Sequence, residues 1–311
     1  MFGVAIQASD APSAVAQIVQ AERAGIPAVW ATVGGAGGVD MLAVYAAAAG
    51  QTERVLFGTS IVQTWPRHPI AIAQAAAAVH QLAPGRLRLG IGPAHEPAMT
   101  RTYGVEWRKP LTQLREYLVV LRALLHEGAV DFEGEHVTAH ARLAPAPMPI
   151  MASALQPRSF ELCGELADGA ISWMCPKPYL LEQALPALHR GAERAGRPAP
   201  PLVAHVPIAV SEDLEAVRAL ARDRLGNYAR VPFYLAMFER AGFADAAEGY
   251  RDALLDGLVV HGTEAEVAAG LRSYLEAGCG EVLAYPLIDP TDAEGSIVRG
   301  FAAVARAHRG E

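Results

Sequence analysis

The chain repeats one hydrophobic pattern, in which a helix-like stretch that ends in glycine is soon followed by a short apolar run. Ala24-Gly25 precedes one such run and Ala277-Gly278 precedes another. A glycine after a helical stretch can take the left-handed conformation that ends a helix. Apolar runs of this length are typical of parallel strands that are buried on both faces. The pattern predicts strands at 3–7, 28–32, 55–61, 87–92, 148–153, 169–173, 202–210 and 281–285.

Strands that alternate with helices indicate an α/β fold with a parallel sheet. The eight predicted strands are the number that closes a (β/α)8 TIM barrel. An open, doubly wound sheet would usually have fewer strands and a GxGxxG turn after the first, which this chain lacks. We therefore predict a single TIM-barrel domain over residues 1–311.

The segments between the strands carry further predictions. The alanine-rich stretch 70–81 is predicted to be a helix, and leucines spaced three or four apart over 111–125 predict another that packs on the barrel. Residues 126–147 are predicted to form a small hairpin before strand five, and about 225–262 a helical insertion between strands seven and eight. The aromatic cluster of this insertion is predicted to be core or a dimer face rather than a substrate wall: Tyr228, Phe233, Tyr234, Met237 and Phe238.

Composition and charge narrow the class of protein. Hydrophobic residues make up 52% of the chain, which gives ample material for a core, and no long uninterrupted apolar window predicts a membrane span. The net charge of −7 with no basic stripe argues against a nucleic-acid partner. The first residues lack the pattern of a signal peptide, and Cys163, Cys175 and Cys279 form no CxxC pair. We expect a cytoplasmic protein.

Active sites of TIM barrels lie at the C-terminal ends of the strands, so the side chains there are the candidates. No pair of strand-end carboxylates, no set at metal-ligand spacing and no strand-end lysine is present. Small residues with a few hydroxyls and histidines predict a site for a large planar cofactor that carries the reaction. Strand seven supplies little of note, and the other ends supply Gln7, Trp30, Ala31, Thr32, Ser60, Ile61, Gly92, His95, Ala152, Ser153, Ala154, Ser172, Trp173 and Tyr285.

Four of these features have a specific interpretation. Ser153 lies just before a helix that Pro157-Arg158 introduces, and a helix N-terminus with a nearby arginine favours a phosphate. The glycine run 34–38 is interpreted as a mobile loop rather than an anion site. His95 is interpreted as a functional residue, whereas for His68 a catalytic role and a packing role at a helix start both stay open.

Motifs over nearly the whole chain resemble a known family, the bacterial luciferase-like oxidoreductases. The third strand and helix, the fourth strand, the following helix and hairpin, and three later junctions each contribute a motif. These are Thr59-Ser60-Ile61-Val62 with Arg67-His68-Pro69, Gly85-Arg86-Leu87 with Gly90-Ile91-Gly92, Arg115-Glu116-Tyr117 with Phe132-Glu133-Gly134, Leu166-Ala167-Asp168-Gly169, Gly262-Thr263 and Glu276-Ala277-Gly278. Within the family the chain looks most like the actinobacterial branch that uses the deazaflavin coenzyme F420.

The resemblance implies F420 at the C-terminal face of the barrel, with hydride transfer at C5 of its ring. It also implies a non-prolyl cis peptide bond at Ser60-Ile61 against the ring, a phosphate site at 152–154 and contacts from Gly169, Ser172 and Trp173. The chain departs from its relatives at strand two, where Ala31 and Thr32 stand in place of an acidic residue or histidine, and at His95, where one branch has a glutamate. The cationic residues that bind a sugar phosphate there have no clear counterpart, so we expect a substrate with little negative charge.

Three hypotheses follow. The first is an F420-dependent oxidoreductase in which His95 or His68 handles the proton, because imidazole titrates near neutral pH. The second is an FMN-dependent monooxygenase on the same barrel, which would use FMNH2 and O2, and the third is a flavin-binding member without catalysis. In each the partner is a small molecule, no metal is expected, and the resemblance implies a homodimer. The predicted cofactor contacts are Ser60, Ile61, Gly92, Ala152, Ser153, Ala154, Ser172 and Trp173.

Overall fold

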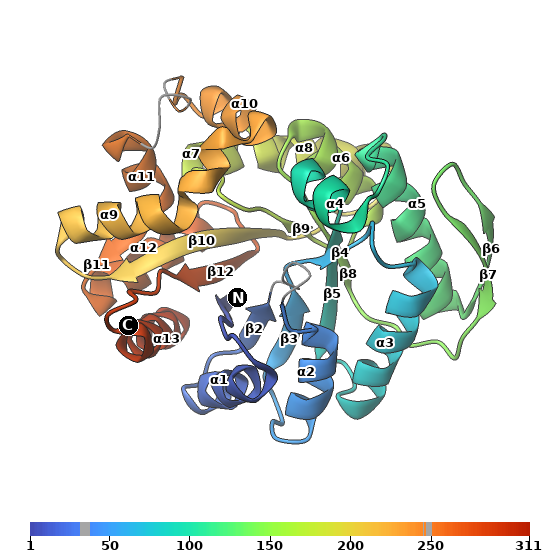
Figure 1. The fold of residues 1–311 in the computed structure, drawn as a ribbon, viewed down its shortest axis with the longest axis horizontal. Coiled ribbons are helices and arrows are strands. Elements are labelled where there is room, and N and C mark those ends of the chain that lie inside the picture. Colours follow the sequence, from blue (N-terminus) through green and yellow to red (C-terminus); the bar gives the residue numbers. More distant parts are fainter. Residues whose placement is uncertain (32–37, 245, 247–250) are drawn as a thin grey trace.

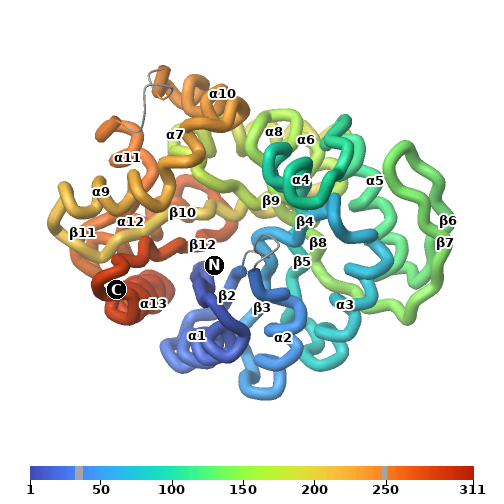
Figure 2. The backbone as a smooth tube through the Cα atoms, in the orientation of Figure 1, coloured from blue at the N-terminus to red at the C-terminus, as the bar shows by residue number. Residues whose placement is uncertain are grey.

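The computed structural model describes residues 1–31, 38–244, 246 and 251–311. Its described part is a closed barrel of parallel strands with helices around it (Figures 1 and 2). The barrel order is β1, β2, β3, β5, β8, β9, β10 and β12, and β12 pairs with β1 again. The strands of the barrel are β1 Phe2–Ala5, β2 Ala28–Ala31, β3 Leu56–Thr59, β5 Leu87–Gly92, β8 Ile150–Ser153, β9 Ala170–Ile171, β10 Leu202–Val210 and β12 Glu281–Pro286.

These strands confirm all eight predicted positions, with several ends moved inward. The predicted strand at 55–61 ends at Thr59, the Ser60–Ile61 peptide bond that follows is cis, and the short β4 (Val62–Gln63) comes next and pairs with β5. The predicted hairpin is present as β6 (Ala129–Glu133) and β7 (Thr138–Arg142), which project beyond the helices in Figure 1. A short strand that was not predicted, β11 (Val260–Gly262), extends the sheet beside β10.

Helices connect the strands and cover the outside of the barrel. The predicted helices at 70–81 and 111–125 are present as α3 and as α5 followed by η1, with Leu114, Leu118, Leu121 and Leu125 fully buried. The described helices are α1 Ala11–Arg23, α2 Met41–Ala49, α3 Pro69–Leu82, α4 Glu96–Tyr103, α5 Pro110–Arg122, α6 Pro157–Leu166, α7 Lys177–Tyr179, α8 Leu185–Arg194, α9 Leu214–Leu225, α10 Pro232–Arg240, α11 Asp252–Leu258, α12 Glu264–Glu276 and α13 Ala293–Arg309, with turns η1 Ala123–Glu127, η2 Leu180–Ala184 and η3 Gly226–Arg230.

Local sequence explains where many helices start. Asp10, Asp40 and Asp213 each accept a backbone N–H of the first turn, which satisfies a donor that the helix itself leaves free. Thr263 and Glu266 form a capping box at the start of α12. Proline in the first turn of α3, α4, α5, α6 and α10 needs no N–H partner there. Residues at these positions therefore mark where the helices begin.

The interior of the barrel is filled around Trp30. Its indole N–H donates to Glu281 Oε1 at 3.0 Å, and the Arg88 guanidinium lies over its ring at 4.3 Å from the centroid. Arg88 also donates to Glu281 Oε2 at 2.5 Å, with both side chains buried. Glycines make the space: a Cβ at Gly58 would stand 2.3 Å from the Trp30 ring, and one at Gly3 would stand 2.8 Å from it. This group, which we call the Trp30 plug, closes the barrel below its C-terminal end.

The region of the predicted insertion contains α9, η3, α10, α11 and β11, and its extent as an insertion stays a prediction. In Figure 1, α11 lies above α9 and α10 lies at the top of the view. Two predicted features, Thr32 and the glycines at 34–37, lie outside the described residues. No helix in the described ranges is long and apolar enough to cross a membrane.

We expect the ion pair in the Trp30 plug to dominate the response of the barrel to mutation. Glu281→Gln keeps the side-chain shape but leaves the Arg88 charge buried and unpaired, so the free energy of unfolding should fall by about 3 kcal/mol or more. The matched control is Glu165→Gln, which removes the negative charge and one of the two acceptors that Arg115 meets at 2.6 Å on a partly exposed carboxylate, and should cost about 1 kcal/mol or less. Urea unfolding of both variants makes the comparison, and equal losses would contradict the assignment.

Candidate active site

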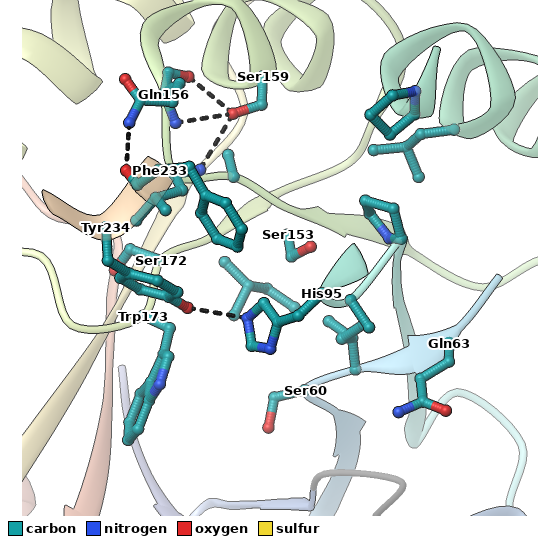
Figure 3. A pocket seen from close by; sticks show the side chains of 18 of the residues that line it. Ser60, Gln63, His95, Ser153, Gln156, Ser159, Ser172, Trp173, Phe233 and Tyr234 are labelled. Carbon is teal, nitrogen blue, oxygen red and sulfur yellow. Dashed lines mark hydrogen bonds between the residues drawn. The ribbon is translucent and has the colours of Figure 1, made fainter. Parts of the chain in front are cut away.

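A cavity of about 660 Å³ opens at the C-terminal ends of the strands, above the Trp30 plug (Figure 3). This volume is within the range of sites for small molecules and cofactors. Its walls come from the loops after β3, β5 and β8, from the start of α5 and from the region between β10 and α11. Most of the lining is aliphatic or aromatic, with hydroxyls, amides and two imidazoles among the polar groups. The position and character of the cavity are those predicted for the site.

The floor of the cavity is set by the alternation of side chains along the strands. Residues two apart point to the same side of a sheet. Met151, Ile171, Val203 and Leu283 pack with Trp30 inside the barrel. Two positions further along these strands stand Ser153, Trp173, His205 and Tyr285, and Ser60 and Gly92 stand two positions after Gly58 and Gly90. We call these six the floor residues, and all except Gly92 line the cavity.

One side of the floor is made of small residues. A Cβ at Gly92 would come within 2.1 Å of Ser153 Oγ and 2.8 Å of Ile61 Cδ1, so these three residues are in close contact. Ser60, Ile61, Ser153 and the neighbouring Ala154 line the cavity here. The cis peptide bond that the resemblance implied at Ser60-Ile61 is present. This side therefore offers small and aliphatic side chains with two hydroxyl groups.

The other side carries large rings. The Trp173 ring centroid lies 4.3 Å from that of His205 and 5.1 Å from that of Tyr285. The Tyr228 ring lies against Trp173 at 5.8 Å, and burial raises the pKa of the Tyr228 and Tyr285 hydroxyls. These groups are therefore uncharged at neutral pH, and they form a neutral aromatic wall.

His95 stands at the start of α4, on the edge of the cavity. Its Nε2 lies 3.2 Å from the hydroxyl oxygen of Tyr234, as Figure 3 shows. The rings of Phe233 and Tyr234 each lie 5.6 Å from its own, and that of Tyr228 lies 5.9 Å away. Burial among these rings lowers the pKa of His95, which favours the neutral imidazole. A neutral imidazole beside a hydroxyl can accept or return a proton.

The aromatic cluster of the region 225–262 divides between two environments, which corrects the prediction that it serves as core or a dimer face. Tyr228, Phe233 and Tyr234 line the cavity, while Met237 and Phe238 are fully buried in the core. The division runs along the chain rather than around the helix: Phe233 and Tyr234 stand in the first turn of α10, and Met237 and Phe238 follow one turn later. Tyr228 lies before them in η3. Sequence spacing alone did not say which apolar neighbour each ring would have.

The helix predicted to hold a phosphate begins beside the cavity as α6. Ser159 Oγ accepts the backbone N–H of Leu155 at 3.0 Å and of Gln156 at 3.1 Å, and Gln156 Nε2 donates to the Phe233 carbonyl at 2.7 Å (Figure 3). The Gln156 bond ties the start of α6 to α10, and the two Ser159 bonds hold the turn before the helix. Arg158 does not line the cavity and lies instead in a neighbouring surface groove with Arg115, Glu161 and Glu165.

Most of the predicted site residues come together. Ser60, Ile61, His95, Ser153, Ala154, Ser172 and Trp173 line the cavity, and Gly92 and Ala152 lie directly behind it as buried strand residues. His68 does not join them. It is exposed at the start of α3, where its Nδ1 accepts the N–H of Ile70 at 3.3 Å and its Nε2 lies 3.0 Å from the Thr138 carbonyl oxygen on the hairpin.

Sequence reasoning missed His205, because it searched strand seven only at its end. The strand is long, and His205 lies in its middle, where it faces Trp173 across the sheet register set by Val203 and Ile171. Counting two positions on from Val203, as for the other strands, would have found it. Trp107, Gln156 and Ser159 also line the cavity from loops and helix starts, where no sequence period marked them.

Charge is sparse in the site. Among the described residues that line the cavity there is no lysine or arginine, and Glu96 at the rim is the one carboxylate. Within the described ranges, no group of three or more His, Cys, Asp or Glu side chains is placed to hold a metal ion. The site as described offers hydrogen bonds and aromatic surface rather than charge.

Comparison of the sequence with known proteins gives a family and named relatives. The family described as luciferase-like monooxygenase matches residues 3–281. An F420-dependent glucose-6-phosphate dehydrogenase of Kineococcus radiotolerans is 32% identical over 74% of this chain and 72% of its own length. An uncharacterised protein of Mycobacterium tuberculosis, Rv1360, is 31% identical over 64% of each chain, so this chain spans about 64% of that relative's length.

Solved structures with the same fold include both deazaflavin and flavin proteins. An F420-dependent secondary alcohol dehydrogenase in complex with an F420-acetone adduct superposes with a TM-score of 0.80, at 19% identity over 99% of this chain and 97% of that one. The FMN-bound oxygenating constituent of 3,6-diketocamphane monooxygenase from Pseudomonas putida gives 0.73, at 17% identity over 94% and 91%. These likenesses establish the barrel.

The buried His205 should make the protein sensitive to mild acid. Burial lowers the pKa of His205 to about 3, so the unfolded chain, with a histidine pKa near 6.5, binds the proton first. The group's contribution to stability is therefore complete above about pH 6.5 and is lost as the pH falls toward 3. Between pH 7 and pH 5 this loss amounts to roughly 2 kcal/mol, since one pKa unit is about 1.4 kcal/mol.

Between pH 7 and pH 5, the free energy of unfolding of His205→Phe should fall by roughly 2 kcal/mol less than that of the parent protein. Urea unfolding at both pH values measures the difference. The exposed His189 on α8 provides the control, and His189→Phe should keep the parent's pH dependence. An unchanged pH dependence in His205→Phe would show that the buried imidazole takes up its proton as readily as the unfolded one.

Proposed function

The chain belongs to the luciferase-like monooxygenase family, and on that premise we propose that it is an oxidoreductase that uses coenzyme F420. The F420-dependent glucose-6-phosphate dehydrogenases among its relatives support this choice of cofactor, because they share 32% of their residues with it over about three quarters of the chain. The observation that carries the proposal is the cavity at the strand ends, in whose described lining no lysine or arginine stands and which has a side of small residues and a side of rings.

The residues present fit a planar deazaflavin ring. The small side of the floor leaves room for a ring, because only the short side chains of Ser60, Ser153 and Ala154 and the aliphatic side chain of Ile61 line it. Ser60 and Ile61 would face the ring, while Ser172 and Trp173 would border it on the floor. The buried backbone of Gly92 and Ala152 would support this surface from behind.

The start of α6 would hold the cofactor's phosphate. Ser153 and Ala154 lie immediately before this helix and line the cavity, and Gln156 and Ser159 lie in its first turn. A helix N-terminus favours an anion through its dipole and its free N–H groups. Arg158 on the same turn adds a positive charge just outside the cavity.

The cofactor supplies a carbon centre that accepts or donates a hydride, so the protein's task is to bind, orient and move one proton. When an alcohol is oxidised, its C–H bond breaks and the electron pair leaves with the hydrogen as hydride. The O–H proton must leave at the same time, and we propose the His95 imidazole as its acceptor, through Nδ1. The Nε2–H would donate to the Tyr234 hydroxyl, which orients the ring and leaves Nδ1 unprotonated. In the reverse direction Nδ1 returns the proton to the carbonyl oxygen.

The aromatic wall excludes water and the lack of cations disfavours an anionic substrate. No lysine or arginine lines the described cavity, so a sugar phosphate would be held without a counter-charge. We therefore infer that the glucose 6-phosphate used by the relatives is not the substrate here. The substrate is a small, uncharged alcohol or carbonyl compound. A homodimer in the cytoplasm, built from one domain per chain, completes the proposal.

Two other functions share the barrel. An FMN-dependent monooxygenase is favoured by the flavin-bound structure of the same fold, and a flavin-binding protein without catalysis would need no proton acceptor. Cofactor binding separates all three.

We expect F420 to bind with a dissociation constant of micromolar or below, and FMN to bind at least about tenfold more weakly, which corresponds to a difference of about 1.4 kcal/mol. Fluorescence titrations of the purified protein with each cofactor at matched concentrations measure this directly. A preference for FMN would move the protein to the oxygen-dependent monooxygenases. Binding of neither would leave the proposal without a cofactor and overturn it.

His95→Gln should lower the turnover of F420 reduction with alcohols by about 100-fold or more, because a general acid or base contributes on that order. The affinity for F420 should stay close to that of the parent protein, since His95 is not among the residues that we propose to contact the cofactor. His68→Gln is the comparison that separates the two histidines, and it should retain turnover because His68 lies outside the cavity. The opposite ranking would assign the proton to His68.

A further inference from the structure

Gln63 presents a carboxamide to the cavity that no other described residue binds. The half-buried side chain lines the cavity from β4, as Figure 3 shows. Within the described residues its amide makes no hydrogen bond, and neither of its polar atoms is enclosed by the fold. The ring nitrogens Trp173 Nε1 and His205 Nε2, in contrast, are enclosed in the floor. Gln63 is therefore a polar group that a ligand in the cavity can reach.

Gln63 stands in one row with the small side of the floor. β4 pairs with β5 so that Gln63 lies opposite Gly92, and β8, which ends at Ser153, pairs with the other edge of β5. Residues paired in this way point to the same face of a sheet. Gly92 has no side chain, and Ser153 Oγ and Ile61 Cδ1 close over the place where its Cβ would stand. The row therefore has a carboxamide at one end and a hydroxyl group at the other.

The proposed function gives this row a direction. Ser153 lies just before α6, whose start would hold the cofactor's phosphate. Gln63 lies on the other side of β5 from Ser153, so it stands further from that phosphate along the row. A planar ring on the small side that extends across Gly92 would therefore bring one of its edges to the Gln63 amide.

The chemistry of a carboxamide selects which edge of the ring this is. A glutamine side chain carries an acceptor and a donor side by side in one plane, and it pairs with ring edges that carry the complementary two groups. Flavin and deazaflavin rings have such an edge in their pyrimidinedione part, where an N3–H lies between two carbonyl groups. No lysine or arginine stands in the described lining, so a neutral hydrogen-bonding group meets a neutral edge.

We propose that Gln63 binds the pyrimidinedione edge of the cofactor ring through two hydrogen bonds, in which Oε1 accepts from N3–H and Nε2 donates to a neighbouring carbonyl. The proposal rests on the proposed function for the presence of the ring on the small side. Apolar contacts and a bound phosphate leave the ring free to turn in its own plane, and two hydrogen bonds at one edge fix that angle. Because flavins and deazaflavins share this edge, Gln63 orients the ring without choosing between them.

The test uses two neutral ring probes, 5-deazalumiflavin and its N3-methyl derivative, in which a methyl group replaces the N3–H. Neither carries a phosphate, so the start of α6 contributes equally little to both. Binding of the probes and of F420 is followed by their fluorescence. The variant is Gln63→Met, which keeps the length of the side chain but has no amide. The control is Gln81→Met, which makes the same change at an exposed position of α3 outside the cavity.

We expect the parent protein and Gln81→Met to bind 5-deazalumiflavin about tenfold more tightly than its N3-methyl derivative, because methylation removes one hydrogen bond. Gln63→Met should bind the two probes with affinities within about twofold of each other, and should bind F420 about tenfold more weakly than the parent does. The thermal unfolding temperature of Gln63→Met without ligand should equal that of the parent, because the amide has no hydrogen bond within the described residues to lose.

Three results would overturn the proposal. These are equal binding of the two probes by the parent, the same discrimination between them in the parent and in Gln63→Met, and a lowered unfolding temperature of Gln63→Met, which would make the amide a structural residue. A failure of the proposed function is visible separately, as a lack of F420 binding by the parent protein. The ratio of the two probe affinities still tests Gln63 in that case, and the absence of all ring binding would overturn both proposals.

Discussion

The architecture of the site depends on one buried ion pair. Arg88 and Glu281 are far apart in the sequence, and their side chains form an ion pair inside the barrel. Both also contact Trp30, because Arg88 lies over its ring and Glu281 accepts its indole N–H. Charges inside a barrel are costly unless they are paired and hydrogen-bonded, so this pair allows few arrangements of the strands that supply it. Glycines at positions 3 and 58 remove the side chains that would collide with the tryptophan. The barrel interior is therefore packed with side chains at the level of these residues, and the cavity lies above them.

Because side chains alternate along a strand, the packing of the Trp30 plug also decides which side chains reach the cavity floor. Each strand that sends a side chain into the plug level sends its next inward side chain into the floor of the cavity. The order of the strands therefore separates two kinds of side chain. Small side chains come from the ends of β3, β5 and β8, and rings come from β9, β10 and β12. The asymmetry of the floor follows from strand order and register.

Burial without charge gives the polar groups of the cavity their character. The hydroxyls of Tyr228 and Tyr285 and the imidazole of His205 are all held in their neutral forms by desolvation. His95 differs in degree, because it lies at the edge and keeps a hydroxyl partner in Tyr234. A site of this kind suits hydride chemistry, in which water and stray charge would compete with the transferred hydrogen.

The sequence by itself determined the barrel, the eight strand positions, the hairpin and most of the small-residue side of the floor. These features depend on local periodicity, glycine and proline signals and short motifs, which are written in neighbouring residues. Only the tertiary structure decided that His68 caps a helix away from the cavity, that Tyr228, Phe233 and Tyr234 line it, and that His205 lies on its floor. Each depends on contacts between distant parts of the chain. His68 contacts the hairpin, the segment of η3 and α10 that carries the three rings packs over the strand ends, and the register of β9 with β10 places His205. The physical reason is that a side chain's burial and partners are set by contacts across the sheet, which no local pattern encodes.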